Sequence, residues 1–314
     1  MTASHLILGV NGLRAVAVLA VVLFHLAPQY FPRGYLGVDV FFVISGFILS
    51  HSIFIENTKY ENQRKSSLAD FFSRRVLRLA PQLLLMIWVV SLLGVFFLPQ
   101  AWISDSHQQS AIWALLGLSN WDFGSGIEAY FEPRAEYNPF LHTWSLGIEV
   151  QFYFLFGCLA IGLLWLVPNK KRALMLLMIC IAIISIFFSI LQYLYLKQDI
   201  FYATAYRLWE IGLGVFLRWR SLEKTPLQKP PTNQGCMPIF AMGLLLFAPT
   251  KALSDGLWPH LLACLFTAAL LVSLTTRRKN ASRLTQFLNS NPLSVVGNAS
   301  YAIYVWHWPV IVYM

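Results

Sequence analysis

The chain has 314 residues, of which 57% are hydrophobic and only 12% charged, and its formal net charge is +9. A water-soluble domain of this length needs far more polar surface, so the composition excludes a soluble globular protein and predicts a polytopic membrane protein. The basic excess lies in loops between apolar segments, where it orients helices and meets anionic lipid, so nucleic acid is not an expected partner.

Apolar stretches of about 20 residues, long enough to cross a bilayer, recur along the whole chain. An apolar piece at 110–118 is too short to cross and is expected to lie at the interface or to re-enter. The predicted fold class is all-α, a polytopic transmembrane helix bundle of about nine to ten spans within one integral membrane domain, residues 1–314. The predicted spans are 8–28, 36–55, 76–98, 140–167, 173–196, 203–219, 236–251, 257–275 and 293–314.

The basic residues predict the orientation of these spans. Alternate loops hold 17 of the 23 lysine and arginine residues, beginning with the loop between the second and third spans, whereas the opposite loops hold four basic residues and seven of the 14 acids. Cytoplasmic loops of membrane proteins carry such an excess of basic residues. The sequence therefore predicts a multi-pass membrane protein with a cytoplasmic N-terminus.

Arg14 and His25 share the first apolar segment, and their spacing places them on one helix face. Eleven steps at about 100° per residue end only about 20° beyond three full turns, and about 16 Å further along the axis. Ionisable groups at membrane depth are costly and usually face a bundle interior or a water-filled cavity for a functional reason. The pair therefore predicts a polar path that reaches both halves of the bilayer.

The other spans contain a short set of ionisable residues. Arg75 and Arg78 open the third span on the predicted cytoplasmic side, close to the depth of Arg14. A second set is expected in the outer halves of the spans or in the last span: His25, Asp39, His142, Glu149, Arg207, Glu210 and His307. His142 and Glu149 are seven residues apart, so the sequence predicts that they share a face of one helix.

Five ordered motifs contain these residues and resemble those of the acyltransferase-3 family of integral membrane O-acyltransferases. The resemblance covers about 300 residues, and every intramembrane charge named above falls inside a motif. The motifs are LRAVAVLAVVLFH (13–25) with GYLGVDVFFVISGFIL (34–49), FFSRRVLRLAP (71–81), LHTWSLGIEVQFY (141–153), YRLWEIGLG (206–214) and YAIYVWHWPV (301–310).

The chain departs from the family pattern in three places. Val150 follows the motif glutamate where an acidic or polar residue is usual, and Gly147 replaces a serine or alanine. Family cores have about ten helices, often with an eleventh that leads to an extracytoplasmic domain like SGNH esterases. The stop at Met314 inside an apolar run suggests that C-terminal helices or that domain belong to a longer natural protein, or that this one is unusually short.

The resemblance implies transfer of an acyl group, usually acetyl, from cytoplasmic acyl-coenzyme A to a hydroxyl of an extracytoplasmic glycan or glycolipid. It also implies that the protein is a multi-pass protein of the bacterial cytoplasmic (inner) membrane. Lipopolysaccharide O-antigen is the acceptor expected by similarity. Arg75 and Arg78 are candidates for binding the phosphates of coenzyme A, because planar guanidinium groups pair well with phosphate oxygens. Arg14 is expected to polarise the thioester carbonyl or to bind the pyrophosphate. The alternative for Arg75 and Arg78 is simple topological anchoring.

His25 is the residue we expect to perform the chemistry. A neutral imidazole can take the proton of an attacking hydroxyl or accept the acyl group as a transient carrier. Asp39 enters the second span from the same side and is expected to orient the His25 ring, and Glu149 completes the predicted catalytic set. The alternative for His25 is a structural hydrogen bond to a backbone carbonyl of a neighbouring helix.

The remaining motif residues have two interpretations. His142, Glu149, Arg207 and Glu210 would bind acceptor hydroxyls or relay a proton, or they would form an ion-pair cluster that holds the predicted fourth and sixth spans together. His307, beside Trp306, Trp308 and Pro309, would line an outer cavity or belong to an aromatic belt at the interface.

Two other functional classes stay open at this point. The charged residues would serve a transporter or flippase as a proton or substrate path, although the two halves show no convincing internal similarity. A weaker alternative is a domain that only delivers acyl groups to a separate outer transferase. No metal and no bound cofactor are expected, and acetyl-CoA (acyl-CoA) enters as the donor substrate.

Overall fold

The computed structural model describes residues 9–51, 66–97, 105–124, 137–166, 170–191, 202–222, 237–247, 257–275 and 283–314. All regular elements in these ranges are helices, which confirms the all-α class for this part of the chain. They are α1 (Val10–Leu26), the 3₁₀ helix η2 (Gly34–Leu36), α2 (Gly37–His51), α4 (Ser66–Phe97), α5 (Asp105–Leu116), α6 (Ser119–Gly124), α7 (Thr143–Leu166), α8 (Lys170–Leu191), α9 (Thr204–Leu222), α10 (Met237–Phe247), α11 (Trp258–Thr275), α12 (Arg283–Leu288) and α13 (Asn291–Val312).

The helices follow the apolar pattern of the sequence with two differences. Each predicted span overlaps a helix, but α4 begins at Ser66, ten residues before the predicted start, and runs for 32 residues. At about 1.5 Å per residue it is about 48 Å long, more than the roughly 30 Å of a hydrocarbon core. The helix therefore extends beyond the hydrocarbon core, and its N-terminal half carries Arg74, Arg75 and Arg78. The second difference concerns the predicted interfacial piece, residues 110–118, most of which forms the C-terminal part of α5.

Two helical stretches among the described residues are long and apolar enough to cross a bilayer alone, Phe71–Phe96 in α4 and Trp258–Thr275. Three apolar stretches are shorter, Val10–Leu26, Gly34–Ser50 and Met175–Leu191. Large apolar side chains are exposed along α4 and α8, among them Trp88, Phe96, Ile183 and Phe187. Such faces suit lipid. The number of spans and the orientation of the N-terminus stay predictions.

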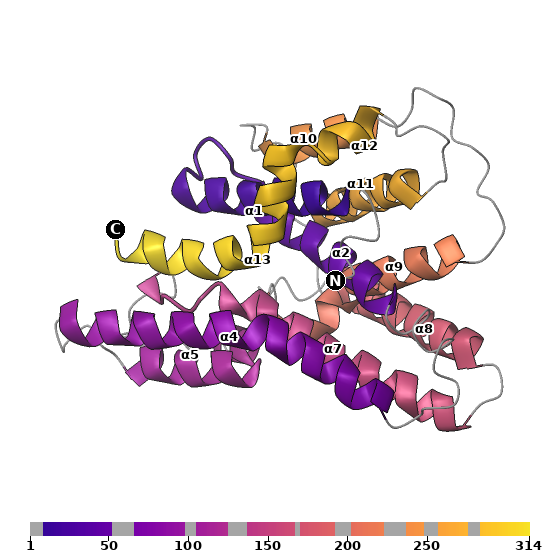
Figure 1. Ribbon diagram of the computed structural model, residues 1–314, viewed down its shortest axis with the longest axis horizontal. Helices are drawn as coiled ribbons and strands as arrows, with labels where there is room; N and C mark the ends of the chain where they lie inside the picture. Colours follow the sequence, from indigo (N-terminus) through magenta and orange to yellow (C-terminus); the bar gives the residue numbers. More distant parts are fainter. Residues whose placement is uncertain are drawn as a thin grey trace.

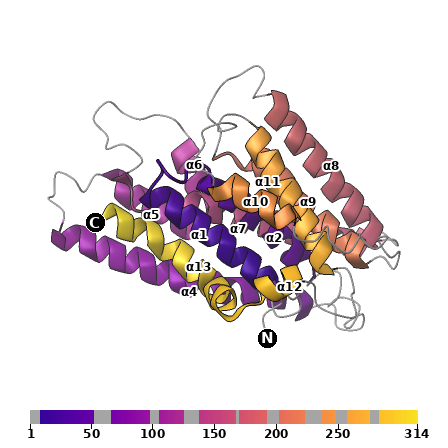
Figure 2. The ribbon, with the colours of Figure 1, turned by 90° about the horizontal axis from the view of Figure 1, so that it is seen from above.

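α1 and α2 lie in the middle of the bundle (Figures 1 and 2). α1 packs against α13 on one side and against α2 on the other, and α2 packs in turn against α9. α8 covers α9, while α4 runs beside α13 on the opposite flank, with α5 and α7 next to it. This order brings the motifs of α1, α2, α4, α7 and α13 around one interior volume.

Glycines allow the close approach of α2 and α9. A Cβ atom added to Gly46 of α2 would lie 2.0 Å from the carbonyl oxygen of Ile211 in α9. A Cβ atom added to Gly214 of α9 would lie 2.0 Å from the carbonyl oxygen of Val43 in α2. Small residues at helix interfaces are a common packing device in membrane proteins. The contact fixes the relative position of the charged residues that the two helices carry.

Candidate active site

A cavity of about 350 Å³ lies between α1, α2, α4, α7 and α13. We call it the arginine cavity. Arg14 of α1 is buried in its wall, and Arg78 of α4 is exposed, so the cationic wall runs from solvent into the interior. Its polar lining is Arg14, Ser45, Arg74, Arg75, Arg78, Ser145, Glu149, Tyr153, Ser300, Tyr301 and Tyr304. The structure thus brings the three predicted arginines, Arg14, Arg75 and Arg78, to one cavity.

Arg75 is held by its own helix. Its Nη1 atom donates a hydrogen bond of 2.6 Å to the carbonyl oxygen of Phe71, and its guanidinium lies 3.5 Å from the centre of the Phe71 ring. A guanidinium that stacks on an aromatic ring is oriented at little entropic cost when it meets an anion. The arrangement prepares a planar cation at the wall of the cavity.

Glu149 lies on the same cavity and is held by two hydroxyl groups. The Oγ atom of Ser45 donates to its Oε1 atom at 2.6 Å, and the hydroxyl of Tyr153, one turn further on α7, donates to the same oxygen. The sequence groups Glu149 with the outer residues, whereas the structure places it on the same cavity as Arg14. A carboxylate among four arginines balances part of their charge and leaves a net positive cavity.

Three imidazoles converge beyond this cavity, and we call them the imidazole cluster: His25 of α1, His142 just before α7, and His307 of α13. The His307 ring centre lies 5.1 Å from that of His25 and 5.6 Å from that of His142. The Nδ1 atom of His25 lies 3.2 Å from the Nε2 atom of His307, at hydrogen-bond distance. Trp308 closes one side of His25, with ring centres 4.7 Å apart, and donates its indole N–H to the carbonyl oxygen of Asn138 at 2.8 Å.

A pair of hydroxyl groups separates the arginine cavity from the imidazole cluster. The hydroxyls of Ser145 and Tyr304 are 2.6 Å apart, and the Tyr304 hydroxyl donates to the carbonyl oxygen of His142 at 3.2 Å. Both residues line the cavity, while the Tyr304 ring lies 5.3 Å from His307 and 5.9 Å from His142. Tyr304 therefore contacts both compartments and forms a partition between them.

Asp39 belongs to a different cluster. Its Oδ1 atom lies 3.1 Å from the Nη1 atom of Arg207 and 2.6 Å from the Nδ1 atom of His260. Arg207 also pairs with Glu210 at 2.9 Å. The expectation that Asp39 orients His25 is therefore not supported, because the hydrogen-bond partner of His25 is His307 and the carboxylate is taken by Arg207.

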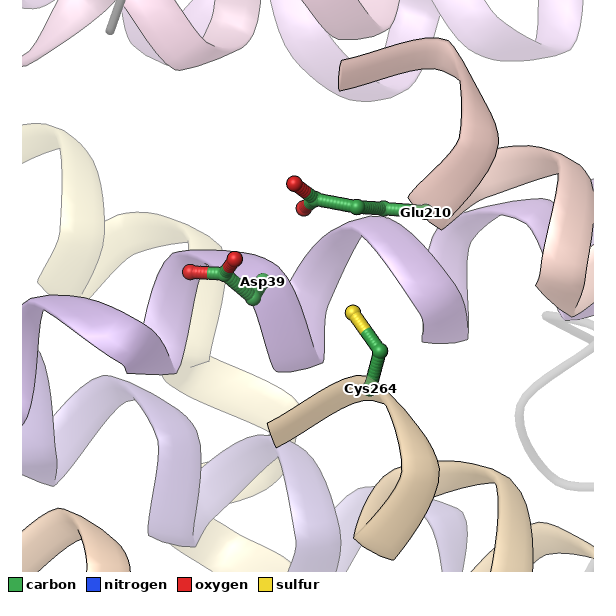
Figure 3. A group of neighbouring side chains, drawn as sticks. All are labelled: Asp39, Glu210 and Cys264. Carbon is green, nitrogen blue, oxygen red and sulfur yellow. The ribbon is translucent and has the colours of Figure 1, made fainter. Parts of the chain in front are cut away.

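This ion cluster joins α2, α9 and α11. Of the predicted fourth and sixth spans only the sixth, α9, takes part, because Glu149 is bonded to Ser45 and Tyr153 and His142 lies in the imidazole cluster. Asp39, Glu210 and Cys264 approach one another from these three helices (Figure 3), and their ligand atoms lie within 4.8 Å of one another. That distance would allow a metal ion. However, the Arg207 guanidinium bonds both carboxylates, and a cation at that position repels a second one. The residues present fit an ion-pair network better than a metal centre.

Several residues of the site are not among the ionisable residues that the sequence places within the membrane. His260 lies in the first turn of α11, near the start of the predicted span 257–275, and is not among the candidate residues named from the sequence. The other missed residues are uncharged: Ser45, Ser145 and Tyr304. Only the distances between their hydroxyl groups and the atoms that they bond reveal their function as hydrogen-bond partners. A search of the motif segments for hydroxyl side chains would have found all three.

The family model described as acyltransferase domain matches residues 7–314. The chain belongs to this family. The match spans every residue of the arginine cavity, the imidazole cluster and the ion cluster, so all three lie inside the family's domain.

Curated relatives agree with the assignment. O-acetyltransferase OatA of Staphylococcus aureus is 31% identical over 98% of this chain and 51% of the relative. Peptidoglycan O-acetyltransferase OatA of Listeria monocytogenes is 30% identical over 96% of this chain and 49% of the relative, and the putative membrane-bound transacylase BcsY of Komagataeibacter xylinus is 32% identical over 96% and 72%. The chain thus spans about half the length of the OatA relatives. No solved structure matches it.

Proposed function

We propose that this chain is the membrane-embedded part of an O-acyltransferase, which moves an acetyl group from cytoplasmic acyl-CoA to a hydroxyl of an extracytoplasmic glycan. The observation that carries the proposal is the placement of three groups: Arg14 of α1 in a cationic cavity, Tyr304 of α13 at the boundary of that cavity, and His25 of α1 in the imidazole cluster beyond it. A donor site and a reactive imidazole therefore lie along one path. The relatives' names, O-acetyltransferase and transacylase, support the same reaction class.

The arginine cavity is the proposed donor site. Coenzyme A carries phosphate groups, and guanidinium groups form strong charge-assisted hydrogen bonds with phosphate oxygens. Arg78 at the exposed end and Arg75 on the wall are placed to meet them, while buried Arg14 is placed to meet the pyrophosphate or the thioester carbonyl. The excess of basic residues in the predicted cytoplasmic loops agrees with a donor that enters from that side.

The imidazole cluster is the proposed reaction centre. In direct transfer the acceptor oxygen bonds to the acyl carbon, the carbon–sulfur bond of the thioester breaks, and His25 moves the hydroxyl proton to the leaving thiolate. In the covalent route a His25 ring nitrogen bonds to the acyl carbon while the carbon–sulfur bond breaks and the coenzyme A thiolate leaves. The acceptor oxygen then bonds to the acyl carbon, the carbon–nitrogen bond breaks, and the hydroxyl proton passes to the freed His25 nitrogen. Both routes need the thioester to pass Tyr304, so the hydroxyl pair with Ser145 must open during turnover.

The proposed acceptor is an envelope glycan on the side of His25. The Listeria relative is named for peptidoglycan, and the family resemblance implies lipopolysaccharide O-antigen, so both acceptors belong in the test. An esterase-like outer domain or a separate outer protein is a proposed partner in the final transfer, since the chain spans only about half of the OatA relatives.

Reconstitution in liposomes tests this function. The full chain is inserted, radiolabelled acetyl-CoA is supplied on the side of the basic loops, and peptidoglycan fragments or lipopolysaccharide are offered on the other side. Label that reaches a glycan hydroxyl as a base-labile ester supports the proposal. Movement of intact acceptor across the bilayer without any loss of the thioester would overturn it in favour of the transporter class.

A further inference from the structure

The His307 ring is held at both of its nitrogen atoms. Its Nδ1 atom lies 2.6 Å from the carbonyl oxygen of Tyr304, one turn earlier in α13, and its Nε2 atom lies 3.2 Å from the Nδ1 atom of His25. His307 is buried, so within the described structure these two bonds fix the orientation of its ring.

The two bonds determine which nitrogen carries each proton. A carbonyl oxygen can only accept, so the Nδ1 atom of His307 must be the donor in the bond to Tyr304. A neutral imidazole has one donor and one acceptor, which leaves the Nε2 atom of His307 as an acceptor. The Nδ1 atom of His25 must then donate to it. The lone pair of neutral His25 is consequently on Nε2.

We infer that His307 is a positioning residue that selects this tautomer of His25, so that the Nε2 atom of His25 is the one available for proton or acyl transfer. The inference rests on the proposed function of His25. It gives His307 the task that the sequence assigned to Asp39, which is bound by Arg207 and His260 at 3.1 and 2.6 Å. Loss of the group that orients a metal-bound imidazole typically costs about 10- to 100-fold in activity, and we expect an effect of that size here.

The surroundings favour the same assignment. Trp308 packs against His25 through ring contact and directs its own N–H to Asn138, so it does not compete for the His25 nitrogens. His142 lies 5.6 Å from His307, ring centre to ring centre, and neither of its ring nitrogens has a hydrogen-bond partner in the part of the chain that the structure describes. His142 therefore leaves both His307 nitrogens to Tyr304 and His25.

A pair of isosteric amides separates positioning from simple packing. His307→Gln places an amide group where Nε2 lies and can still accept from His25, whereas His307→Asn places its amide where Nδ1 lies and can reach only the Tyr304 carbonyl. We expect the asparagine variant to lower kcat by about 10- to 100-fold with an unchanged KM for acetyl-CoA. We expect the glutamine variant to recover most of that loss. Equal activity of both variants, whether high or low, overturns the inference.

Nitrogen-15 NMR of histidine-labelled protein gives a readout that does not depend on activity. The His25 signals are identified by their loss in His25→Ala. In the unchanged protein we expect Nδ1 of His25 to be protonated and Nε2 to be bare, and in His307→Asn we expect the proton to move at least partly to Nε2. A His25 ring protonated only at Nε2 in the unchanged protein contradicts the inference.

The same assays distinguish this inference from the proposed function. If His25→Ala retains full thioester consumption, the proposed function of His25 fails. If His25→Ala is inactive while His307→Asn keeps normal kcat and the same His25 tautomer, only the positioning by His307 fails.

Discussion

Arg14 and His25 project from the same helix, but Arg14 lies in the wall of the arginine cavity and His25 is bonded to His307 beyond the Tyr304–Ser145 hydroxyl pair. One helix therefore connects a cationic site with an imidazole site. This relationship gives each proposed step its place, with donor binding on one side of Tyr304 and acyl transfer on the other. It also leads to separate predictions for binding, passage and stability.

Arg78→Ala should weaken donor binding and leave the chemical step nearly unchanged. A charge-assisted hydrogen bond contributes about 1.5–3 kcal/mol, so the KM for acetyl-CoA should rise by about 10- to 100-fold. Steady-state kinetics with varied acetyl-CoA measure the change. Arg220→Ala is the matched control, because it removes the same charge from the end of α9, away from the arginine cavity. Equal effects of the two variants would favour general charge anchoring.

Tyr304→Ala should open the partition between the two compartments. With the ring and its hydroxyl removed, water reaches a bound thioester, and acetyl-CoA hydrolysis without acceptor should rise several-fold. Tyr304→Phe keeps the ring and loses only the bonds to Ser145 and the His142 carbonyl, so its hydrolysis should stay close to that of the unchanged protein. Release of free acetate in the absence of glycan measures the difference, and no rise in the alanine variant would refute a barrier at Tyr304.

Arg207→Met should destabilise the bundle, because it leaves two buried carboxylates without their cation. Removing one partner of a buried ion pair costs about 3–5 kcal/mol. Denaturant unfolding in detergent micelles measures the loss. Adding Asp39→Asn and Glu210→Gln removes the unpaired charges and should recover much of the stability. A triple variant no more stable than Arg207→Met would argue against ion pairing as the cause.

Gly214→Ala should also lower stability, through packing instead of charge. The added Cβ atom would lie 2.0 Å from the carbonyl oxygen of Val43, so α2 and α9 must separate, at a cost of about 1–3 kcal/mol. Gly243→Ala in α10 is the control, because apart from its chain neighbours and its own helix backbone no atom of the described residues lies within 4 Å of its added Cβ. Unfolding measurements should show a loss for the first variant and none for the second. Similar losses in both would point to a general effect of replacing glycine.

The sequence predicts the helices and most of the polar residues, because apolar length and the cost of charge at membrane depth are local properties. It also places Arg14, Arg75 and Arg78 together correctly. It fails for Asp39 and Glu149, whose partners Arg207, His260 and Ser45 come from other helices. The depth of a residue along its span does not determine which neighbouring helix packs against it. For Asp39, the close contact of α2 with α9 at Gly46 and Gly214 determines that Arg207 is its partner.

Thioester consumption by His25→Ala tests the central claim most directly. The variant and the unchanged protein are reconstituted side by side with radiolabelled acetyl-CoA and acceptor glycan, and acetyl-CoA binding is measured in both. We predict that consumption falls by at least about 100-fold, since a positioned acid–base residue contributes that much, while binding in the arginine cavity is retained. Unchanged consumption in the variant would contradict a chemical role for His25 and the path that leads to it.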